Sequence, residues 1–307
     1  MFAKNKTRKL EKDVQEERIE SLFRIGARRF ARDKVSMFVL IALILICVVA
    51  FAAPLVGVDY ESIESRRVVD GITYRPPYSP SAVNPFGTDQ LGRDLLSRVL
   101  YGLCVSLTVG ILARGGSMLL GTAIGVTAGY FGGWVETILM RLTDIMLAFP
   151  ALLMAMAITF VLQPSMSTVC AAIIVVGWPD IARLMRSQTL VLKNKEYVKA
   201  ARALGLSRWK IIFRHIIPNS LSLLLVNFSL GIPGAIMYES GLSFFGYGVQ
   251  PPMPSLGSII SDGRSYISLA PWYIIAPGLV LVLVVVCFNM LGDGLVDAFD
   301  PHSERRG

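Results

Sequence analysis

Long apolar stretches recur throughout this 307-residue chain, and they limit the folds open to it. An α-helix needs about 20 apolar residues to cross a hydrocarbon core about 30 Å thick. Six stretches approach or exceed that length, at 36–58, 100–131, 136–162, 168–185, 216–238 and 272–291. Apolar residues make up 53% of the chain, more than the roughly 45–50% of a soluble domain. The sequence therefore predicts an all-α membrane protein with six transmembrane helices.

The basic residues are clustered beside these stretches and predict which side of the membrane each end occupies. Eleven of the 30 Lys and Arg residues lie in residues 1–35 and nine lie in 183–214, whereas 240–271 contains only Arg264. Lys and Arg are concentrated in cytoplasmic loops of membrane proteins. We therefore expect both termini and 183–214 on the cytoplasmic side, and the net charge of +8 is no sign of nucleic-acid binding.

The same reading divides the chain into five segments. An amphipathic helix over Glu16–Arg32 is expected within a cytoplasmic N-terminal segment, with a disordered basic leader as the alternative. The triplet Ala50-Phe51-Ala52 resembles a signal-peptidase site, but the long, Glu-containing leader and long apolar run favour an uncleaved helix. The segments are 1–35 at the N-terminus, 36–58 as the first span, 59–98 as an extracytoplasmic loop, 99–292 as a core with five spans, and 293–307 as a cytoplasmic tail.

A strongly polar island, 193–219, separates the fourth span from the fifth. Its composition predicts a short helix over Glu196–Leu204, followed by Gly205 as a C-cap, because glycine enters the left-handed region without steric cost. Ser207 is placed to N-cap a second helix. In that helix four apolar residues recur at helical spacing: Trp209, Ile212, Phe213 and Ile216. A charged helix pair between membrane spans suits contact with a protein outside the membrane.

This island resembles a motif of known proteins. Lys199-Ala200-Ala201, three residues, Gly205, nine residues and His215-Ile216-Ile217-Pro218 are similar to E-A-A-x3-G-x9-I-x-L-P, the coupling-loop motif of bacterial ABC importer permeases. Lys199 replaces the usual Glu, and His215 replaces the usual Ile. In that family the loop, here 193–215, docks in a cleft of the ATP-hydrolysing subunit. The resemblance implies docking by Glu196, Lys199, Ala200, Ala201, Gly205, Leu206, Ser207, Trp209 and Ile212.

Three further blocks support the same resemblance and narrow it. Residues 84–94, NPFGTDQLGRD, resemble the H-P-L-G-T-D-x-x-G-R-D signature of peptide-type permeases, with Asn84 and Phe86 in place of His and Leu. Residues 144–150, DIMLAFP, resemble another family block. Residues from Glu239 onward resemble E-A-S-L-S-F-L-G-x-G-V-Q-P-P, with Gly241 in place of Ser.

Taken together, these blocks resemble the dipeptide/oligopeptide/nickel permeases of binding-protein-dependent ABC importers. The resemblance implies the type I importer permease fold in the cytoplasmic membrane of a bacterium or archaeon. It implies as partners a second homologous permease, two ABC ATPases, an extracytoplasmic solute-binding protein and membrane lipid. No cofactor is expected on this chain, because the partner subunits would bind ATP. The solute stays open between di- or oligopeptides and nickel, glutathione or oligosaccharides.

Several other residues carry expectations from the sequence alone. Gly121, Gly125 and Gly129 form a double GxxxG that favours close helix packing. Arg114 is costly in lipid, so it should face protein or water, either as a structural partner or on the solute pathway. Asp89 and Arg93 are spaced for an ion pair on a helix surface, and Arg141 and Asp144 for a pair at i,i+3.

The sequence lacks the residues that several other classes of function require. The sequence contains no P-loop and no GxSxG or HExxH motif, and no plausible Ser/His/Asp set is apparent, so a membrane-embedded hydrolase is disfavoured. The four widely spaced cysteines and two histidines predict neither a disulfide framework nor a metal site. An ion-driven secondary transporter would need intramembrane acids on its pathway, whereas mid-span ionisable residues here are expected to amount to Arg114.

Overall fold

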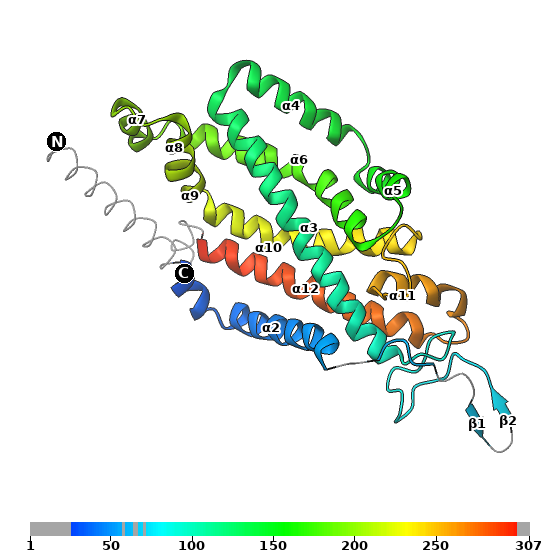
Figure 1. Cartoon of the computed structure of the whole chain (residues 1–307). Helices are drawn as coiled ribbons and strands as arrows, with labels where there is room; N and C mark the ends of the chain where they lie inside the picture. The colour runs from blue at the N-terminus through cyan, green and yellow to red at the C-terminus, as the bar shows by residue number, and fades with distance from the viewer. Residues whose placement is uncertain (1–25, 57–58, 64–66, 70–71, 300–307) are drawn as a thin grey trace.

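The computed structural model describes residues 26–56, 59–63, 67–69 and 72–299 as a bundle of long helices (Figure 1). The predicted amphipathic helix over Glu16–Arg32 falls mostly outside these residues, and only 26–32 of it are seen, as helix. The helices are α2 Lys34–Leu55, α3 Leu95–Phe131, α4 Gly133–Ala148, α5 Ala151–Leu162, α6 Met166–Leu192, α7 Glu196–Ala203, α8 Arg208–Ile211, α9 Ile217–Asn219, α10 Leu221–Phe244, α11 Leu256–Gly263 and α12 Trp272–Phe299.

Shorter elements complete the described chain. A π-helical turn, Ile212–Ile216, joins α8 to α9, and a 3-10 turn, Arg264–Tyr266, follows α11. Strands β1 Arg67–Val69 and β2 Ile72–Tyr74 pair antiparallel, with Val68 opposite Thr73. This hairpin lies at the opposite end of the bundle from α7 and α8 (Figure 1).

Five helices in the described part of the chain are long and apolar enough to cross a membrane: α2, α3, α6, α10 and α12. These match five of the six predicted spans, which confirms the all-α membrane fold class. Their ends run beyond the predicted limits. In particular, α3 begins at Leu95 instead of 100, and α12 continues to Phe299 through the start of the predicted tail.

The third predicted span, expected as one helix to Leu162, is instead two helices. α4 and α5 meet at an angle of 90° and count as a sixth span only if the pair is taken together. The break falls at Phe149-Pro150, where Phe149 has extended backbone angles, φ −95° and ψ 142°. Proline disfavours the helical region for the residue before it, so the helix ends there.

The close packing of α3 on α6 confirms the structural role expected for the double GxxxG. A β-carbon on Gly121 would lie 2.6 Å from the carbonyl oxygen of Trp178, and one on Gly125 would lie 2.3 Å from that of Ala182. At Gly129 the nearest atom would be the Arg186 carbonyl oxygen, at 2.8 Å. Only glycine allows the two backbones to approach so closely.

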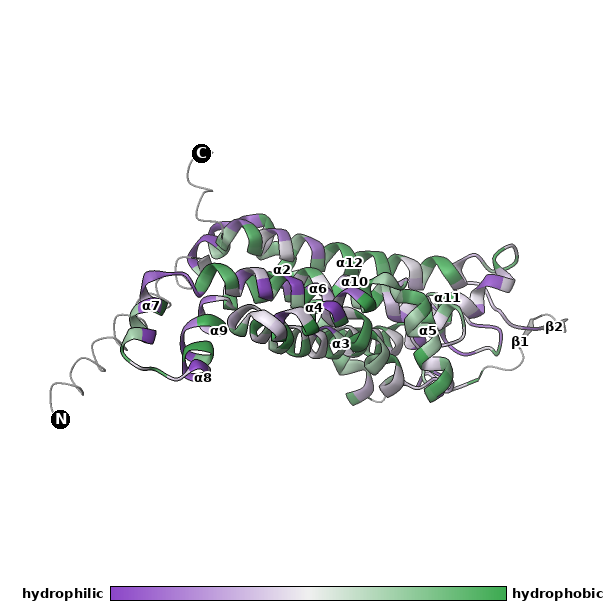
Figure 2. Ribbon diagram, turned by 90° about the horizontal axis from the view of Figure 1, so that it is seen from above, coloured by the Kyte–Doolittle hydropathy of each residue, from purple (hydrophilic) through white to green (hydrophobic). Residues whose placement is uncertain are grey.

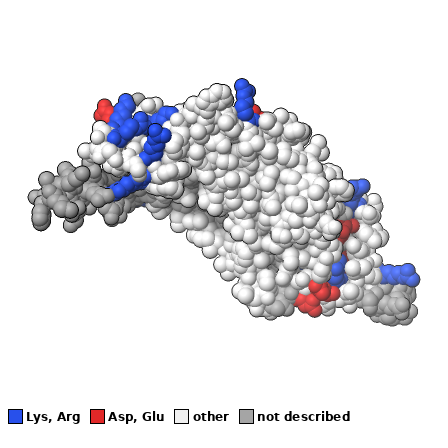
Figure 3. Space-filling model, turned by 45° about the horizontal axis from the view of Figure 1, so that its top comes forward, with Lys and Arg blue, Asp and Glu red and all other residues white. Residues whose placement is uncertain are grey.

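Charge and hydropathy are distributed as a membrane protein requires. Hydrophilic positions are concentrated around α7 and α8, and apolar positions follow the lengths of the central helices (Figure 2). In the space-filling view, Lys and Arg gather at one end and charges of both signs at the other, with mostly uncharged surface between (Figure 3). This uncharged region suits contact with lipid.

The ends of the described chain lie beside each other. A β-carbon on Gly26 would lie 2.6 Å from the Phe299 ring, and one on Gly294 would lie 3.3 Å from the Phe30 ring. Both ends are on the same side of the bundle as α7 and α8 (Figure 1).

Candidate coupling site and the polar clusters of the bundle

The turn at Gly205 fixes the angle at which α7 meets the following chain. Gly205 has φ +78°, the left-handed conformation predicted for it. Its N–H donates to the Arg202 carbonyl at 3.0 Å, and the Leu206 N–H donates to the Ala201 carbonyl at 3.2 Å. These two bonds define a Schellman motif, which satisfies carbonyls at the helix end. The turn is therefore a defined structure within the loop.

The second helix of the loop differs from the expectation in two ways. Ser207 stands at the N-cap position of α8, but its side chain forms no capping hydrogen bond. The predicted apolar stripe is also split, because Ile212 and Ile216 are buried whereas Trp209 and Phe213 are 54% and 66% exposed. The chain widens into the π-helical turn here, just before Pro218, which has no N–H to continue the helical ladder.

Several contacts hold this helix pair against the bundle. The Lys193 ammonium donates to the Gly129 carbonyl at 2.7 Å, which joins the start of the loop to the end of α3. The Trp209 ring lies 5.5 Å from that of Phe131, centre to centre. Val198 and Ile211 are buried in the same apolar cluster as Met185 of α6. These contacts join the loop to α3 and α6.

The predicted docking residues do not all share one environment. Ala201 and Ile212 are buried and Leu206 is half-buried, so Ala201 and Ile212 support the helix pair from beneath. We name the remaining exposed residues, with Leu204, the coupling surface: Glu196, Lys199, Ala200, Leu204, Gly205, Ser207 and Trp209.

Arg114 faces protein, as expected from its cost in lipid. Its Nη2 donates to the carbonyl oxygen of Asn227 at 2.9 Å and also contacts the Asn227 side-chain oxygen. The guanidinium passes directly over Gly231, where a β-carbon would lie only 1.8 Å from Nε. Gly231 of α10 therefore leaves room for the arginine of α3 in the position that it occupies here.

Arg114 is not the only ionisable side chain within the span-length helices, contrary to the expectation, and Glu239 is another. Glu239 is fully buried in α10. Its carboxylate accepts hydrogen bonds from Ser106 at 2.8 Å and from Ser243 at 2.7 Å. Ser255 in turn donates to Ser243 at 3.1 Å. Ser243, four residues after Glu239 on the same helix, could have been identified from the sequence as a partner. Ser106 and Ser255 could not, because they come from distant segments.

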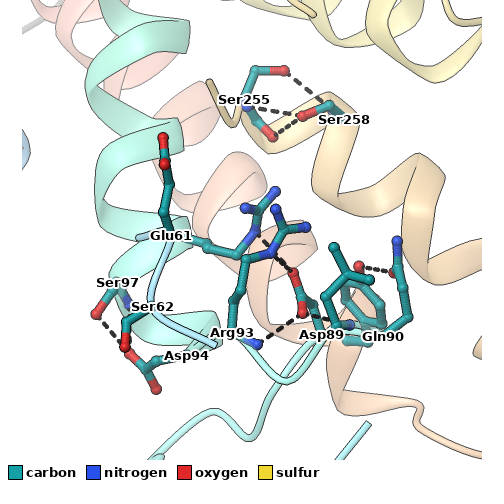
Figure 4. Close-up of polar contacts among 12 residues, drawn as sticks. Glu61, Ser62, Asp89, Gln90, Arg93, Asp94, Ser97, Ser255 and Ser258 are labelled. Atoms are coloured by element: carbon teal, nitrogen blue, oxygen red, sulfur yellow. Dashed lines mark hydrogen bonds and ion pairs between the residues drawn. The ribbon is translucent and has the colours of Figure 1, made fainter. Parts of the chain in front are cut away.

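The loop before α3 contains a buried charge cluster in place of the expected helix-surface pair. Asp89 and Arg93 do interact, at 2.6 Å, but Asp89 lies in a turn and its side chain is 0% exposed (Figure 4). The Arg98 guanidinium lies 3.3 Å away on the same carboxylate oxygen. Burial raises the pKa of Asp262 on α11, and Arg98 and Arg93 oppose that rise. Asp89 in the 84–94 segment thus contacts Arg98 at the start of α3, and Asp262 of α11 lies near enough to both arginines to interact with them electrostatically.

The predicted pair of Arg141 and Asp144 is wrong. Asp144 instead pairs with Arg183 of α6, at 2.6 Å between Oδ1 and Nη2. Glu136 of α4 pairs with Arg186 of α6 in the same way, at 2.6 Å between Oε1 and Nε. Both acids therefore join α4 to α6, an arrangement that spacing along one helix cannot reveal.

Comparison with known proteins agrees with this architecture. The sequence of residues 121–305 matches the protein family described as the binding-protein-dependent transport system inner membrane component. Residues 21–85 match a second family, the N-terminal transmembrane domain of oligopeptide transport permease C. The dipeptide transport system permease protein DppC of Alkalihalophilus pseudofirmus is 40% identical over 92% of this chain and 90% of its own length.

The chain belongs to the binding-protein-dependent ABC transport permeases.

Other relatives of this permease carry different solute names. The glutathione transport system permease protein GsiD of Pectobacterium atrosepticum is 39% identical over 94% of each chain, and the oligopeptide transport system permease protein OppC of Haemophilus influenzae is 38% identical over 94% of this chain and 92% of its own. An inward-facing MetNI methionine ABC transporter has a TM-score of 0.54 at 18% identity over 67% of this chain and 96% of the other. That likeness confirms the importer-permease fold. The permease is thus a multi-pass inner-membrane subunit whose ATPase activity resides in partner subunits.

Proposed function

We propose that this permease moves di- or oligopeptides into the cell as one of two permeases in a binding-protein-dependent ABC importer. Relatives named for dipeptide and oligopeptide transport support the solute class, since they are similar over nearly the whole chain. The glutathione permease is consistent with it, because glutathione is itself a small peptide. Nickel or an oligosaccharide is a less favoured solute.

The coupling surface is the observation that carries this proposal. It is an exposed helix pair, fixed by the Schellman turn at Gly205 and joined to α3 through Lys193 and Trp209. A rigid projection of this kind can transmit the closure of an ATPase dimer into the spans. Closure would move α3 and α6 together, because their backbones are in contact at Gly121 and Gly125.

The same arrangement gives the proposed orientation. The ATPases are cytoplasmic, so α7 and α8 would be cytoplasmic as well. The two ends of the described chain lie on that side (Figure 1), which supports cytoplasmic termini. The β1–β2 hairpin and the Asp89 cluster would then face the extracytoplasmic solute-binding protein.

In this mechanism the residues of this chain bind the partner subunits and change position with them, and none of them takes part in a chemical reaction. ATP binding would close the ATPases, and the coupling surface would follow that closure. The spans would turn from inward- to outward-facing and accept the solute from the binding protein. Hydrolysis in the partner subunits would then reset the permease.

The test is purification of the tagged permease in mild detergent from its native membrane, followed by reconstitution with the subunits that copurify. We expect two P-loop ATPases, a second permease and vanadate-sensitive ATP hydrolysis that drives uptake of dialanine or trialanine. Uptake of nickel or a sugar in place of both peptides would refute the solute class. A chain that is isolated alone even after crosslinking would refute the importer assembly.

A further inference from the structure

A cavity of about 190 Å³ lies where α4 and α5 bend apart. Its walls come from α3, α6 and α10 as well as from the bend, which contributes Phe149. Irregular backbone at membrane depth is tolerated where it is buried in protein or lines a water-filled cavity. The 90° break between α4 and α5 lies beside this cavity, which is large enough to hold water or a small ligand.

Two opposite charges line this otherwise largely apolar cavity: Arg114 of α3 and Asp180 of α6. They are near enough to interact electrostatically, yet they form no ion pair in the part of the chain that the structure describes. Charges inside a span are costly and mark solute paths when they face a cavity. The two groups are thus separated and available to a third molecule.

Arg114 has donors that the protein does not use. Within the described residues its hydrogen bonds all go to Asn227 and all leave from Nη2. Its Nε also lacks a hydrogen-bond partner but is fully buried, so Nη1, which forms no hydrogen bond within the described residues, is the donor that a solute in the cavity could reach. A guanidinium binds a carboxylate best through two parallel N–H groups. A purely structural arginine would be expected to use these remaining donors on the protein.

We propose that this cavity is a subsite for a zwitterionic peptide, with the C-terminal carboxylate on Arg114 and the N-terminal ammonium at Asp180. The inference rests on the proposed peptide function and adds the residues that would hold the solute inside the membrane. The apolar wall, including Met154 and Val176, would accept small side chains. A peptide bound by both ends would satisfy the two charges at once.

Gly234 provides a probe position in this cavity. It lines the space, and a β-carbon there would meet no atom within 4 Å. A Gly234→Cys variant of the full complex is reacted with methanethiosulfonate reagents carrying either a sulfonate or an ammonium group. Mass spectrometry of the peptide that contains residue 234 measures the modification, so the native cysteines do not interfere. Gly278→Cys on α12, also open within 4 Å, is the matched control.

The expected results are specific to charge and to peptide ends. Dialanine, added without binding protein, should slow modification at Gly234→Cys severalfold, whereas its C-terminal amide should not. Arg114→Gln should lower the sulfonate-to-ammonium rate ratio about tenfold, since one nearby positive charge is lost. Asp180→Asn should raise that ratio, and this exposed residue can be exchanged without disturbing the fold. Gly278→Cys should show none of these effects.

Other outcomes would overturn the subsite without touching the proposed function. Equal protection by dialanine and its amide, or no protection in a complex that transports dialanine, would show that Arg114 does not hold the carboxylate. If assembly with the second permease alone blocks modification at residue 234, the cavity is filled by that subunit. A complex that hydrolyses ATP but transports no peptide would refute the proposed function itself.

Discussion

The hydroxyl of Ser106 donates a 2.8 Å hydrogen bond to the carboxylate of Glu239, a residue 133 positions away in the sequence. The same hydroxyl also accepts the Leu256 N–H at 3.3 Å. One serine on α3 therefore joins α10 to the beginning of α11. Buried polar groups of this kind are costly unless every partner is present.

Removal of the Glu239 side chain should destabilise the permease strongly. Glu239→Ala leaves Ser106 and Ser243 without their acceptor, at a cost of about 3 kcal/mol in free energy of unfolding. Ser106→Ala should cost less, about 1–2 kcal/mol, because it removes one of the two short bonds to Glu239 and the weaker bond from the Leu256 N–H. Thermal unfolding of the purified complex in detergent checks both values. Equal stability of Glu239→Ala and the wild type would show that the network contributes nothing.

The GxxxG contact should tolerate no side chain. Gly125→Ala places a methyl group 2.3 Å from the Ala182 carbonyl oxygen, and overpacking of this kind costs about 1–3 kcal/mol. Gly115→Ala, on the same helix, is the control because its nearest atom would lie at 4.0 Å. Helix propensity favours that change by about 0.5–1 kcal/mol. Membrane levels and melting temperature should fall only in Gly125→Ala; a fall of both variants would contradict the contact.

The two kinds of ion pair should differ in their effect on stability. Asp89→Asn leaves Arg98 buried without its counter-charge, and breaking a buried pair costs about 3–5 kcal/mol. Asp144→Asn breaks a pair whose side chains are 48% and 51% exposed, so its cost should be about 0–1 kcal/mol. Chemical denaturation of the two variants side by side is the measurement. A larger loss of stability in Asp144→Asn than in Asp89→Asn would contradict this prediction.

A side chain at Gly205 should uncouple the permease without unfolding it. Gly205→Asp adds a charge to the coupling surface, where no atom lies within 4 Å of the new β-carbon. Uptake and copurification of the ATPases should be lost, with expression and membrane insertion retained. Gly246→Asp is matched, since Gly246 also has positive φ, +84°, and open surroundings. ATPase binding should survive in that variant, and normal uptake by Gly205→Asp would refute the docking assignment.

Lys199 tests the same surface by its charge. It is exposed on α7 and stands where the family motif has Glu. We expect an acidic partner on the ATPase, so Lys199→Glu should weaken copurification of the ATPases, most clearly at low salt. Lys199→Gln should have a smaller effect. Unchanged coupling in Lys199→Glu would count against such a partner.

Local signals explain why much of the architecture could be predicted. The length of an apolar run is a property of one segment, so the spans could be predicted from it. The left-handed turn at Gly205 was also predictable, because it depends on the identity of a single residue. The glycine pattern in α3 likewise predicted a close contact, although not that α6 would make it. Pro150 was present as a signal for the break in the third span, but the continuous apolar run around it concealed the bend.

The sequence by itself determined the membrane fold, five of its spans and the charged loop between the fourth and fifth predicted spans. Tertiary structure alone decided the partners: Asp144 with Arg183, Glu239 with Ser106, and Ile212 buried while Trp209 is exposed. The reason is physical. Helix formation and burial in lipid depend on neighbours along the chain, whereas a hydrogen bond or ion pair depends on which helices are in contact.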